Sequence, residues 1–507
     1  MQYRSLAVLG TGSDVGKSVI AAALCRAFVK QGLKVAPFKA QNMSNNSGVT
    51  PEGLEMGRAQ IVQAEAARIA PHVDMNPVLL KPTSDVGSQV VVLGRATENR
   101  SAMAYRELKN RLFRVSREAY ARLQAQYELM VLEGAGSCAE VNLMDHDFVN
   151  FAMAEQADAA VILVADIHRG GVFAQIVGTL ACLPEKYRER VAGFIINRFR
   201  GDVRLFRDGV GWIEAETGKP VFGVLPWYTH LRIEPEDSVT IETPPRVAGS
   251  RRAEPAVAVI RLPHIANFTD FQPLEAVAGL DLFFLEEVQS LAGFKAVIIP
   301  GSKNTRADLN WLHQSGWAGE IGAFVRDGGH VLGICGGYQM LGRTVHDWEG
   351  LEGEPGATGG LDLLPVETWL QAPKTTTRTR FAREGAEGFG YEIHMGRTVR
   401  SGGEPWARVL ARNGEVLEDS DGCVARQGRI LGTYIHGLFD SPAVLGHWLA
   451  GLGLEDLKVP DRHGPQVRDR DYDLLAEHFA QHVDMHAIAK LIRFANEGDP
   501  LSPSPLT

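Results

Sequence analysis

A single cysteine lies in the segment HVLGICGGYQMLG, residues 330–342, with a glycine two positions before it and two glycines directly after it. The apolar residues before Cys335 are typical of a buried strand, and those after it of the start of a helix. A nucleophile on such a sharp turn adopts a strained backbone conformation, which small neighbours permit. The helix N-terminus favours the thiolate form. The pattern predicts a nucleophilic thiol, although most free cysteines are merely small buried hydrophobic residues.

Two other segments supply partners for this nucleophile. The segment YIHGLF places His436 at the end of a predicted late strand, where its imidazole can meet Cys335 and act as a base. The segment VIIPGSKNT places Gly301 and Ser302 on a strand-end turn. Their backbone and the N–H of Gly336 are predicted to bind an oxyanion. Together the three segments predict covalent catalysis by a thiol.

A second site is predicted in VLGTGSDVGKSVIAAAL, residues 8–24, where glycines separate a strand from an alanine-rich helix. The strict P-loop pattern fails at one position, because Thr11 stands where the first glycine belongs. Backbone N–H groups around Gly12 and Gly16 and the helix N-terminus can still bind the phosphates of ATP. Lys17 is predicted to reach the terminal phosphates, and the next residue, Ser18, to help hold Mg²⁺.

Two strand ends are predicted to complete the nucleotide site. Glu133 ends the apolar strand of LMVLEG, where a second Mg²⁺ ligand is expected, although a carboxylate at a strand end is also a common structural cap. Asn197 ends the strand of FIINRFRGD and is suited to reading a purine edge; the alternative is a simple asparagine turn. Cys138, in GAGSCAE, is the other cysteine of interest because it lies near this site.

The first half resembles dethiobiotin synthetase in the spacing of its glycine-rich loop. Two longer segments, 35–67 and 75–94, resemble the cobyric acid synthase family, the glutamine-hydrolysing amidotransferases of cobalamin biosynthesis. This resemblance implies that Lys39 lies close to the transferred phosphoryl group, where a fixed cation stabilises developing charge. The alternative is a solvated lysine after a strand. For Lys81 the two alternatives are evenly balanced.

The second half resembles class I glutamine amidotransferases, in which a cysteine attacks the glutamine side-chain amide and forms a thioester. Many of these carry His-Pro-Glu, whereas glycine and leucine follow His436 here, so the orienting glutamate is missing. The branch that contains the cobyric acid and cobyrinic acid diamide synthases is known for this absence. The segment FGYEIHMG also resembles the family, and its His394 either lines the glutamine site or only packs.

These resemblances imply an ATP- and glutamine-dependent ligase that amidates the b, d, e and g carboxylates of adenosylcobyrinic acid a,c-diamide, giving adenosylcobyric acid. One departure is His168, where the family is expected to have aspartate, between the expected types at Asp166 and Arg169. Three alternatives stay open: a cobyrinic acid a,c-diamide synthase, a non-enzymatic P-loop switch with an inactive amidotransferase domain, and a stand-alone glutaminase. Such switches usually carry an early loop lysine, and Gly12 occupies that position.

The elements that position these residues alternate between short apolar runs and longer amphipathic stretches, which is typical of parallel α/β sheets. We therefore expect two α/β domains, a P-loop parallel sheet flanked by helices and a class I amidotransferase-like domain. The predicted divisions are 1–242 for the ATP and corrinoid domain, 243–254 for a linker, 255–450 for the amidotransferase domain and 451–507 for a helical extension with a disordered tail. The strand candidates are 6–10, 33–38, 129–134, 159–166, 191–197, 220–226, 256–262, 281–286, 295–301 and 330–335, and the segment 429–439, with the late strand that ends at His436, follows near the end of the second series.

Composition narrows the class of protein. The 507 residues are 45% hydrophobic and 22% charged, as in ordinary globular proteins. The net charge of −9 argues against nucleic acid or an anionic membrane surface as the main partner, and we expect small-molecule substrates instead. The five cysteines form no CxxC pair, which disfavours a disulfide framework or a zinc site and favours a reduced, cytoplasmic setting.

Overall fold

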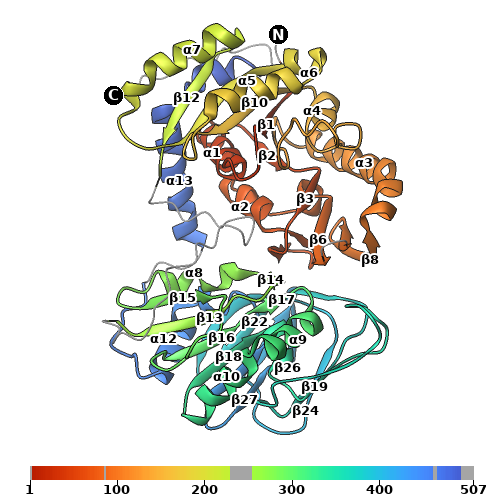
Figure 1. Ribbon diagram of the computed structural model, residues 1–507, viewed down its shortest axis with the longest axis vertical. Coiled ribbons are helices and arrows are strands. Elements are labelled where there is room, and N and C mark those ends of the chain that lie inside the picture. Colours follow the sequence, from red (N-terminus) through yellow and green to blue (C-terminus); the bar gives the residue numbers. More distant parts are fainter. Residues whose placement is uncertain (1–2, 85–86, 229–253, 461–464, 493–507) are drawn as a thin grey trace.

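The computed structural model describes residues 3–84, 87–228, 254–460 and 465–492, which form two α/β domains (Figure 1). The first is built on a six-stranded parallel sheet in the order β12-β11-β10-β1-β9-β2. Its strands match the predicted apolar runs closely, because strands buried on both faces are apolar throughout. They are β1 (Ser5–Gly10), β2 (Val35–Phe38), β9 (Leu129–Glu133), β10 (Ala159–Asp166), β11 (Val191–Phe199) and β12 (Val221–Pro226).

Helices cover both faces of this sheet. Alternate residues of β1 belong to two separate hydrophobic clusters: Leu6 and Val8 face one, Ala7 and Leu9 the other. This two-residue period is the pleat of a strand buried on both sides. The helices of this domain are α1 (Lys17–Lys30), α2 (Arg58–Ala66), α3 (Ala102–Gln124), α4 (Phe151–Gln156), α5 (Val172–Cys182), α6 (Glu185–Arg190) and α7 (Arg207–Thr217).

Residues 41–101 form two small sheets that the sequence analysis did not predict. The larger has the order β3-β6-β7-β8, and the smaller pairs β4 with β5. These strands contain lysine, asparagine, glutamine and glycine among their apolar residues, so no continuous apolar run marks them. Their bounds are β3 (Gln41–Met43), β4 (Ser47–Val49), β5 (Glu55–Gly57), β6 (Val78–Ser84), β7 (Gly87–Val92) and β8 (Arg95–Ser101).

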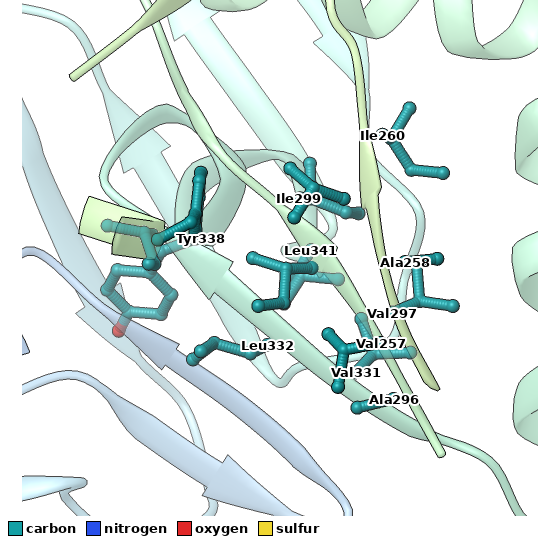
Figure 2. Close-up of a cluster of buried hydrophobic side chains, with 14 of the residues drawn as sticks. Val257, Ala258, Ile260, Ala296, Val297, Ile299, Val331, Leu332, Tyr338 and Leu341 are labelled. Atoms are coloured by element: carbon teal, nitrogen blue, oxygen red, sulfur yellow. The ribbon is translucent and has the colours of Figure 1, made fainter. Parts of the chain in front are cut away.

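The second domain is built on a sheet in the order β15-β13-β16-β18-β28-β27, parallel except for β27 at its edge. In its core, Tyr338 and Leu341 pack against strand residues such as Val297 and Leu332 (Figure 2). This packing seats the short helix α11 directly on the strand that precedes it. The strands are β13 (Ala256–Ile260), β15 (Asp281–Leu285), β16 (Ala296–Ile299), β18 (His330–Ile334), β27 (Cys423–Ala425) and β28 (Ile430–Thr433).

The helices of the second domain follow or connect these strands. They are α8 (Gln272–Glu275), α9 (Thr305–Ser315), α10 (Trp317–Arg326), α11 (Gly336–Met340) and α12 (Pro442–Gly451). A short two-stranded sheet pairs β14 (Ile265–Ala266) with β17 (Gly301–Ser302) beside the predicted oxyanion turn. This pairing joins two segments that are far apart in the sequence.

Residues 344–421 also hold strands that the sequence analysis did not predict, because partly exposed strands alternate apolar and polar residues; all their pairings are antiparallel except that of β19 with β21. They form two four-stranded sheets, in the orders β20-β19-β21-β24 and β23-β22-β25-β26. Their bounds are β19 (Thr344–Asp347), β20 (Gly356–Gly359), β21 (Val366–Trp369), β22 (Thr375–Arg383), β23 (Ala386–His394), β24 (Arg397–Arg400), β25 (Ala407–Arg412) and β26 (Glu415–Asp421).

The chain returns to the first domain after α12. Helix α13 (Pro465–His482) lies along α1, and α14 (Met485–Ala489) follows it (Figure 1). The predicted linker 243–254 and the predicted disordered tail fall almost entirely outside the described residues. Within the described part of the chain, no helix is both long and apolar enough to cross a membrane.

Candidate active sites

The predicted strand-to-helix turn at Cys335 is present. Strand β18 ends at Ile334, α11 begins at Gly336, and Cys335 between them has φ 54° and ψ −109°, a conformation that non-glycine residues rarely adopt. The thiol is nearly buried, with 6% of the residue exposed, and lies 3.5 Å from the carbonyl oxygen of Ile393. The backbone N–H of Cys335 donates to the carbonyl of Thr433 on β28, which holds the turn on the sheet.

His436 contacts the thiol, and a carboxylate orients the ring from its other side. Its Nδ1 lies 2.7 Å from Oδ2 of Asp270, and the Asp270 Oδ1 accepts a bond from the N–H of Gly437. Burial lowers the pKa of His436, but Asp270 and Cys335 outweigh it and raise that pKa to about 10. Asp270, 4% exposed, thus takes the place of the orienting glutamate that the sequence lacks. The arrangement favours a thiolate–imidazolium pair.

His436 lies beyond the end of β28, not at a strand end as the sequence predicted. The strand stops at Thr433 because the carboxylate of Asp421 accepts hydrogen bonds from the Thr433 hydroxyl and from the N–H of Tyr434. Farther on, the backbone of His436 pairs with that of Tyr391 on β23. This second pairing places the imidazole at the strand-to-helix turn that carries Cys335, which is called the elbow below.

The glycines of the elbow allow three backbones to meet. A Cβ on Gly336 would lie 2.8 Å from the backbone nitrogen of Ser302, and one on Gly337 would collide with the carbonyl of Ile299. Gly301 is equally close to the site, since a Cβ there would be 3.1 Å from Cε1 of His436. The predicted oxyanion residues Gly301, Ser302 and Gly336 are therefore brought together around the thiol. These close approaches leave no room for a side chain at position 336 or 337.

A pocket opens beside Cys335 and carries both signs of charge. Lys303 and Glu352 line it together with Gln339 and His394. Burial lowers the pKa of Lys303 to about 8, assisted by Lys81, and burial raises the pKa of Glu352 to about 7. His394, which stacks on Tyr434 with ring centroids 3.7 Å apart, thus lines the site, the first of the two roles considered for it. The pocket suits a small zwitterion.

The first domain contributes to this pocket. Lys81, 2% exposed, lines it from β6, and its Nζ lies 2.8 Å from both the Glu55 carboxylate and the Ser47 hydroxyl. Glu55 also pairs at 2.7 Å with Lys374 of the second domain. Burial alone would raise the pKa of Glu55, but Lys374 and Lys81 hold it well below its usual range. Lys81 therefore lines the pocket beside Cys335, and because it is buried the alternative of a solvated lysine is wrong.

One residue of the second domain contacts both the base and the first domain. The Oδ1 of Asn267 accepts a 3.0 Å bond from the N–H of Ser47, so its amide nitrogen faces His436, 3.3 Å from Nε2. Asn267 is 3% exposed and has φ 53°, a left-handed conformation that asparagine tolerates better than most residues. Asn267 thus directly connects the backbone of the first domain to the ring of His436.

The glycine-rich loop of the first domain has the form expected of a phosphate-binding loop, and it is called the phosphate cradle below. It curls around the ammonium of Lys17, which donates to the carbonyls of Gly12 and Gly136 at 3.1 and 2.9 Å. A Cβ on Gly10 would lie 2.8 Å from the Gly12 carbonyl and 3.0 Å from Nζ of Lys17, so only glycine fits there. Gly16, with φ 94°, precedes the first residue of α1. The residues present fit the phosphates of a nucleotide.

Several polar side chains converge on Glu133 beside this loop, at the end of β9. The Glu133 carboxylate, 1% exposed, accepts a 2.7 Å bond from the Ser18 hydroxyl and lies 3.1 Å from Nζ of Lys39. Gln63 of α2 donates to its other oxygen. A hydroxyl and a carboxylate at this spacing fit a Mg²⁺ ion that takes its remaining ligands from phosphates and water. No group of three or more His, Cys, Asp or Glu residues suited to a metal occurs among the described residues.

The other predicted residues of this half have mixed outcomes. Asn197 lines a cavity beside Gly16, and its amide already bonds the carbonyl of Val15 and the N–H of Arg198. His168 is exposed and stacks on Trp227, with ring centroids 4.8 Å apart. Cys138 is buried, and burial raises the pKa of its thiol to about 12 although Lys17 opposes this, which disfavours a reactive thiolate.

Sequence reasoning missed the residues that only the fold brings to Cys335. Asp270, Asn267 and Glu352 belong to no motif; Asn267 and Asp270 share one short segment, and Glu352 comes from a distant one. A signal existed for Asp270, which is a lone carboxylate between Phe268 and Phe271 in an apolar segment, because charges in such surroundings are rarely buried without a partner. No comparable signal marked the other two.

Comparison with known proteins assigns both halves. Residues 6–241 match the model of the CobQ/CobB/MinD/ParA nucleotide-binding domain, and residues 256–444 that of the CobB/CobQ-like glutamine amidotransferase domain. Cobyric acid synthases from Chlorobium chlorochromatii and Pelodictyon phaeoclathratiforme are each 51% identical to the chain, over 97% of it and 97% and 98% of their own lengths. One from Syntrophobacter fumaroxidans is 49% identical over 96% of the chain and 98% of its own. The chain belongs to the cobyric acid synthase family.

Proposed function

We propose that this protein uses ATP and glutamine to amidate the b, d, e and g carboxylates of adenosylcobyrinic acid a,c-diamide, producing adenosylcobyric acid. The observation that carries the proposal is the pairing, in one chain, of a thiol–imidazole–carboxylate site with a P-loop site, in a sequence that matches a cobyric acid synthase over 97% of its length. An inactive amidotransferase domain would have no reason to keep Asp270 and His436 aligned on Cys335.

In the second domain the thiolate of Cys335 attacks the side-chain carbonyl carbon of glutamine. Backbone N–H groups at Ser302 and Gly336 stabilise the oxyanion, and the imidazolium of His436 gives its proton to the departing nitrogen as the C–N bond breaks. Ammonia leaves and a glutamyl thioester remains. Water, deprotonated by His436, then cleaves the thioester and releases glutamate, restoring the thiolate–imidazolium pair.

The charged lining of the pocket supports recognition of glutamine itself. Lys303 is placed to bind the α-carboxylate and Glu352 the α-ammonium group, while the side-chain amide reaches Cys335. Two opposite charges in one pocket bind a zwitterion more tightly than a simple amide, because each charged group of the ligand gains a charge-assisted hydrogen bond. This lining favours free glutamine over a protein-bound amide as the ammonia source.

In the first domain a corrinoid carboxylate oxygen attacks the terminal phosphorus of ATP, and the bond to ADP breaks. Lys17 and Lys39 stabilise the charge that develops on the transferred group, and Ser18 and Glu133 would hold Mg²⁺, which neutralises the phosphate oxygens. The acyl phosphate that forms has a good leaving group. Ammonia attacks its carbonyl carbon, phosphate departs and an amide remains.

The contacts between the domains support coupling of the two reactions. Asn267 links the Ser47 backbone to His436, and Glu55 binds a lysine from each domain. A movement of the 41–57 segment when the first domain fills with substrates would therefore change the surroundings of the catalytic base. Such a link favours release of ammonia when an acceptor is present.

Mass spectrometry of the corrinoid tests the proposal. The purified protein is incubated with ATP and glutamine and with either adenosylcobyrinic acid a,c-diamide or the corresponding acid without amides. The expected result is a ladder of four successive carboxylate-to-amide conversions on the diamide. Amidation of the a and c carboxylates of the unamidated acid, with the diamide left unchanged, would refute the proposal in favour of a diamide synthase.

A further inference from the structure

The C-terminal helix α13 follows the second domain in sequence but is anchored to the first. Tyr472, Leu475 and Phe479 pack into the hydrophobic cluster that contains α1 residues. Arg26 of α1, fully buried, pairs with Asp469 at 2.5 Å. Beyond the helix, the N–H of Asp484 donates to the carbonyl of Phe222 on β12 at 2.7 Å. Helix α13 is thus a fixed part of the first domain, as its place beside α1 and β12 in Figure 1 shows.

One face of α13 borders a cavity at the start of the P-loop helix. From the first domain this cavity is lined by Gly16 and Asn197 and by the segment 225–228, and from α13 by Leu475, His478 and Phe479. Because Gly16 adjoins the phosphate cradle, a nucleotide held there by its phosphates has this cavity within reach of its base. The lining combines apolar walls with a few polar atoms, as expected for a planar heterocycle.

His478 lines this cavity and carries an unused acceptor. Its Nε2 is buried and has no hydrogen-bond partner among the described residues, while the ring bonds to the carbonyl of Pro226. That second bond takes the proton of Nδ1, which leaves Nε2 as an unprotonated acceptor. Burial and the neighbouring His482 lower the pKa of His478, which keeps the ring neutral. An orphaned buried acceptor calls for a donor from a ligand.

We infer that α13 completes the nucleotide site, with Leu475 and Phe479 against the base and the Nε2 of His478 accepting a hydrogen bond from the 6-amino group of adenine. The inference rests on the proposal that the first domain binds ATP. It assigns a role in substrate discrimination to a segment beyond residue 444, where both family matches have ended. Hypoxanthine has a carbonyl group in place of the 6-amino group. Its carbonyl oxygen and the Nε2 of His478 are both acceptors, so no hydrogen bond would form between them.

Titration calorimetry with ADP and with inosine diphosphate tests the inference on the full-length protein. The His478→Ala variant is expected to bind ADP about three- to tenfold more weakly, the worth of one neutral hydrogen bond, with little change for inosine diphosphate. The preference for ADP therefore falls. His478→Gln, whose side-chain oxygen can accept, is expected to recover part of that preference. His486→Ala, on the exposed side of α14, is the matched control, and thermal unfolding followed by circular dichroism checks the fold.

Two results would overturn the inference. One is an unchanged preference for ADP in His478→Ala; the other is equal weakening of both nucleotides, which would make His478 a structural residue. Failure of the unmodified protein to bind either nucleotide would instead refute the proposed ATP-dependent function, so the two failures are distinguishable.

Discussion

The two sites of this molecule are built in opposite ways. The phosphate cradle comes from one short loop, residues 10–18, and Glu133 at the end of an adjacent strand completes it. The glutamine site gathers residues from eight separate segments, and one of its lining residues, Lys81, belongs to the other domain. The first site depends on local backbone conformation, whereas the second depends on how distant segments pack. Substitutions should therefore separate the two activities.

The largest expected effect comes from Cys335→Ala. Without the nucleophile, glutamine-dependent amidation should fall by at least about 10³-fold, while amidation supported by free ammonium salts should persist. Both rates are measured from the corrinoid product. The exposed Cys182→Ala is the matched control. Loss of the ammonium-supported reaction as well would mean that the thiol acts beyond glutamine hydrolysis.

The reciprocal change, Lys17→Ala, should separate the sites in the other direction. Removing the cation that the loop encloses should slow ATP-dependent amidation by about 10²- to 10³-fold with either nitrogen source, because a preorganised charge on the phosphates is lost. Hydrolysis of glutamine to glutamate, measured without corrinoid, should continue. Unaltered amidation in this variant would remove Lys17 from the phosphoryl-transfer site.

Asp270→Asn tests the carboxylate that the sequence analysis overlooked. Glutamine hydrolysis should fall by about 10²-fold, the scale of positioned acid–base catalysis. The His436 pKa, raised to about 10 by Asp270 and Cys335 against burial, should also drop, so the alkaline limb of the pH–rate profile moves to lower pH. Because the folded pKa is raised, stability from this pair is complete below about pH 6.5 and disappears as pH rises through 10.

The comparison for this variant is Asp281→Asn on the exposed edge strand β15. That change should leave both the rate and the pH profile of glutamine hydrolysis as they are. An Asp270→Asn enzyme with full activity and an unshifted profile would remove Asp270 from the site.

Lys303→Met addresses recognition of glutamine. The KM for glutamine should rise by about 10- to 100-fold, because a charged hydrogen bond to the α-carboxylate is lost. The maximal rate at saturating glutamine should change much less. Lys295→Met, an exposed lysine of the same domain, provides the control. A normal KM would show that the α-carboxylate binds elsewhere.

The smallest effect is expected at the domain junction. Lys374→Met leaves Glu55 paired with Lys81 alone, so docking should weaken by less than the roughly 3 kcal/mol typical of breaking a buried pair outright. The measurement is the ratio of glutamate formed to amide formed, which should increase severalfold as ammonia release loses its link to the acceptor. The exposed Lys458→Met should keep the wild-type ratio; equal ratios in both variants would rule out coupling through Glu55.

The same contrast explains what the sequence could predict. Strands buried on both faces, such as β10, are continuous apolar runs, and the loop around Lys17 and the elbow at Cys335 are local patterns, so all three were predicted correctly. The strands of residues 41–101 and 344–425 contain many polar side chains and were not predicted. Asp270 and Lys81 reach Cys335 only through tertiary packing, which leaves no spacing in the sequence to read.

The most direct test of the central claim follows the origin of the amide nitrogen. The enzyme is given ATP, corrinoid diamide, unlabelled ammonium, and glutamine labelled with heavy nitrogen at its side-chain amide. The mass of the corrinoid product is then measured by mass spectrometry. We predict heavy nitrogen in the new amides from the wild type and only light nitrogen from Cys335→Ala. Heavy nitrogen in the product of the variant would contradict the assignment of glutamine hydrolysis to the Cys335–His436–Asp270 site.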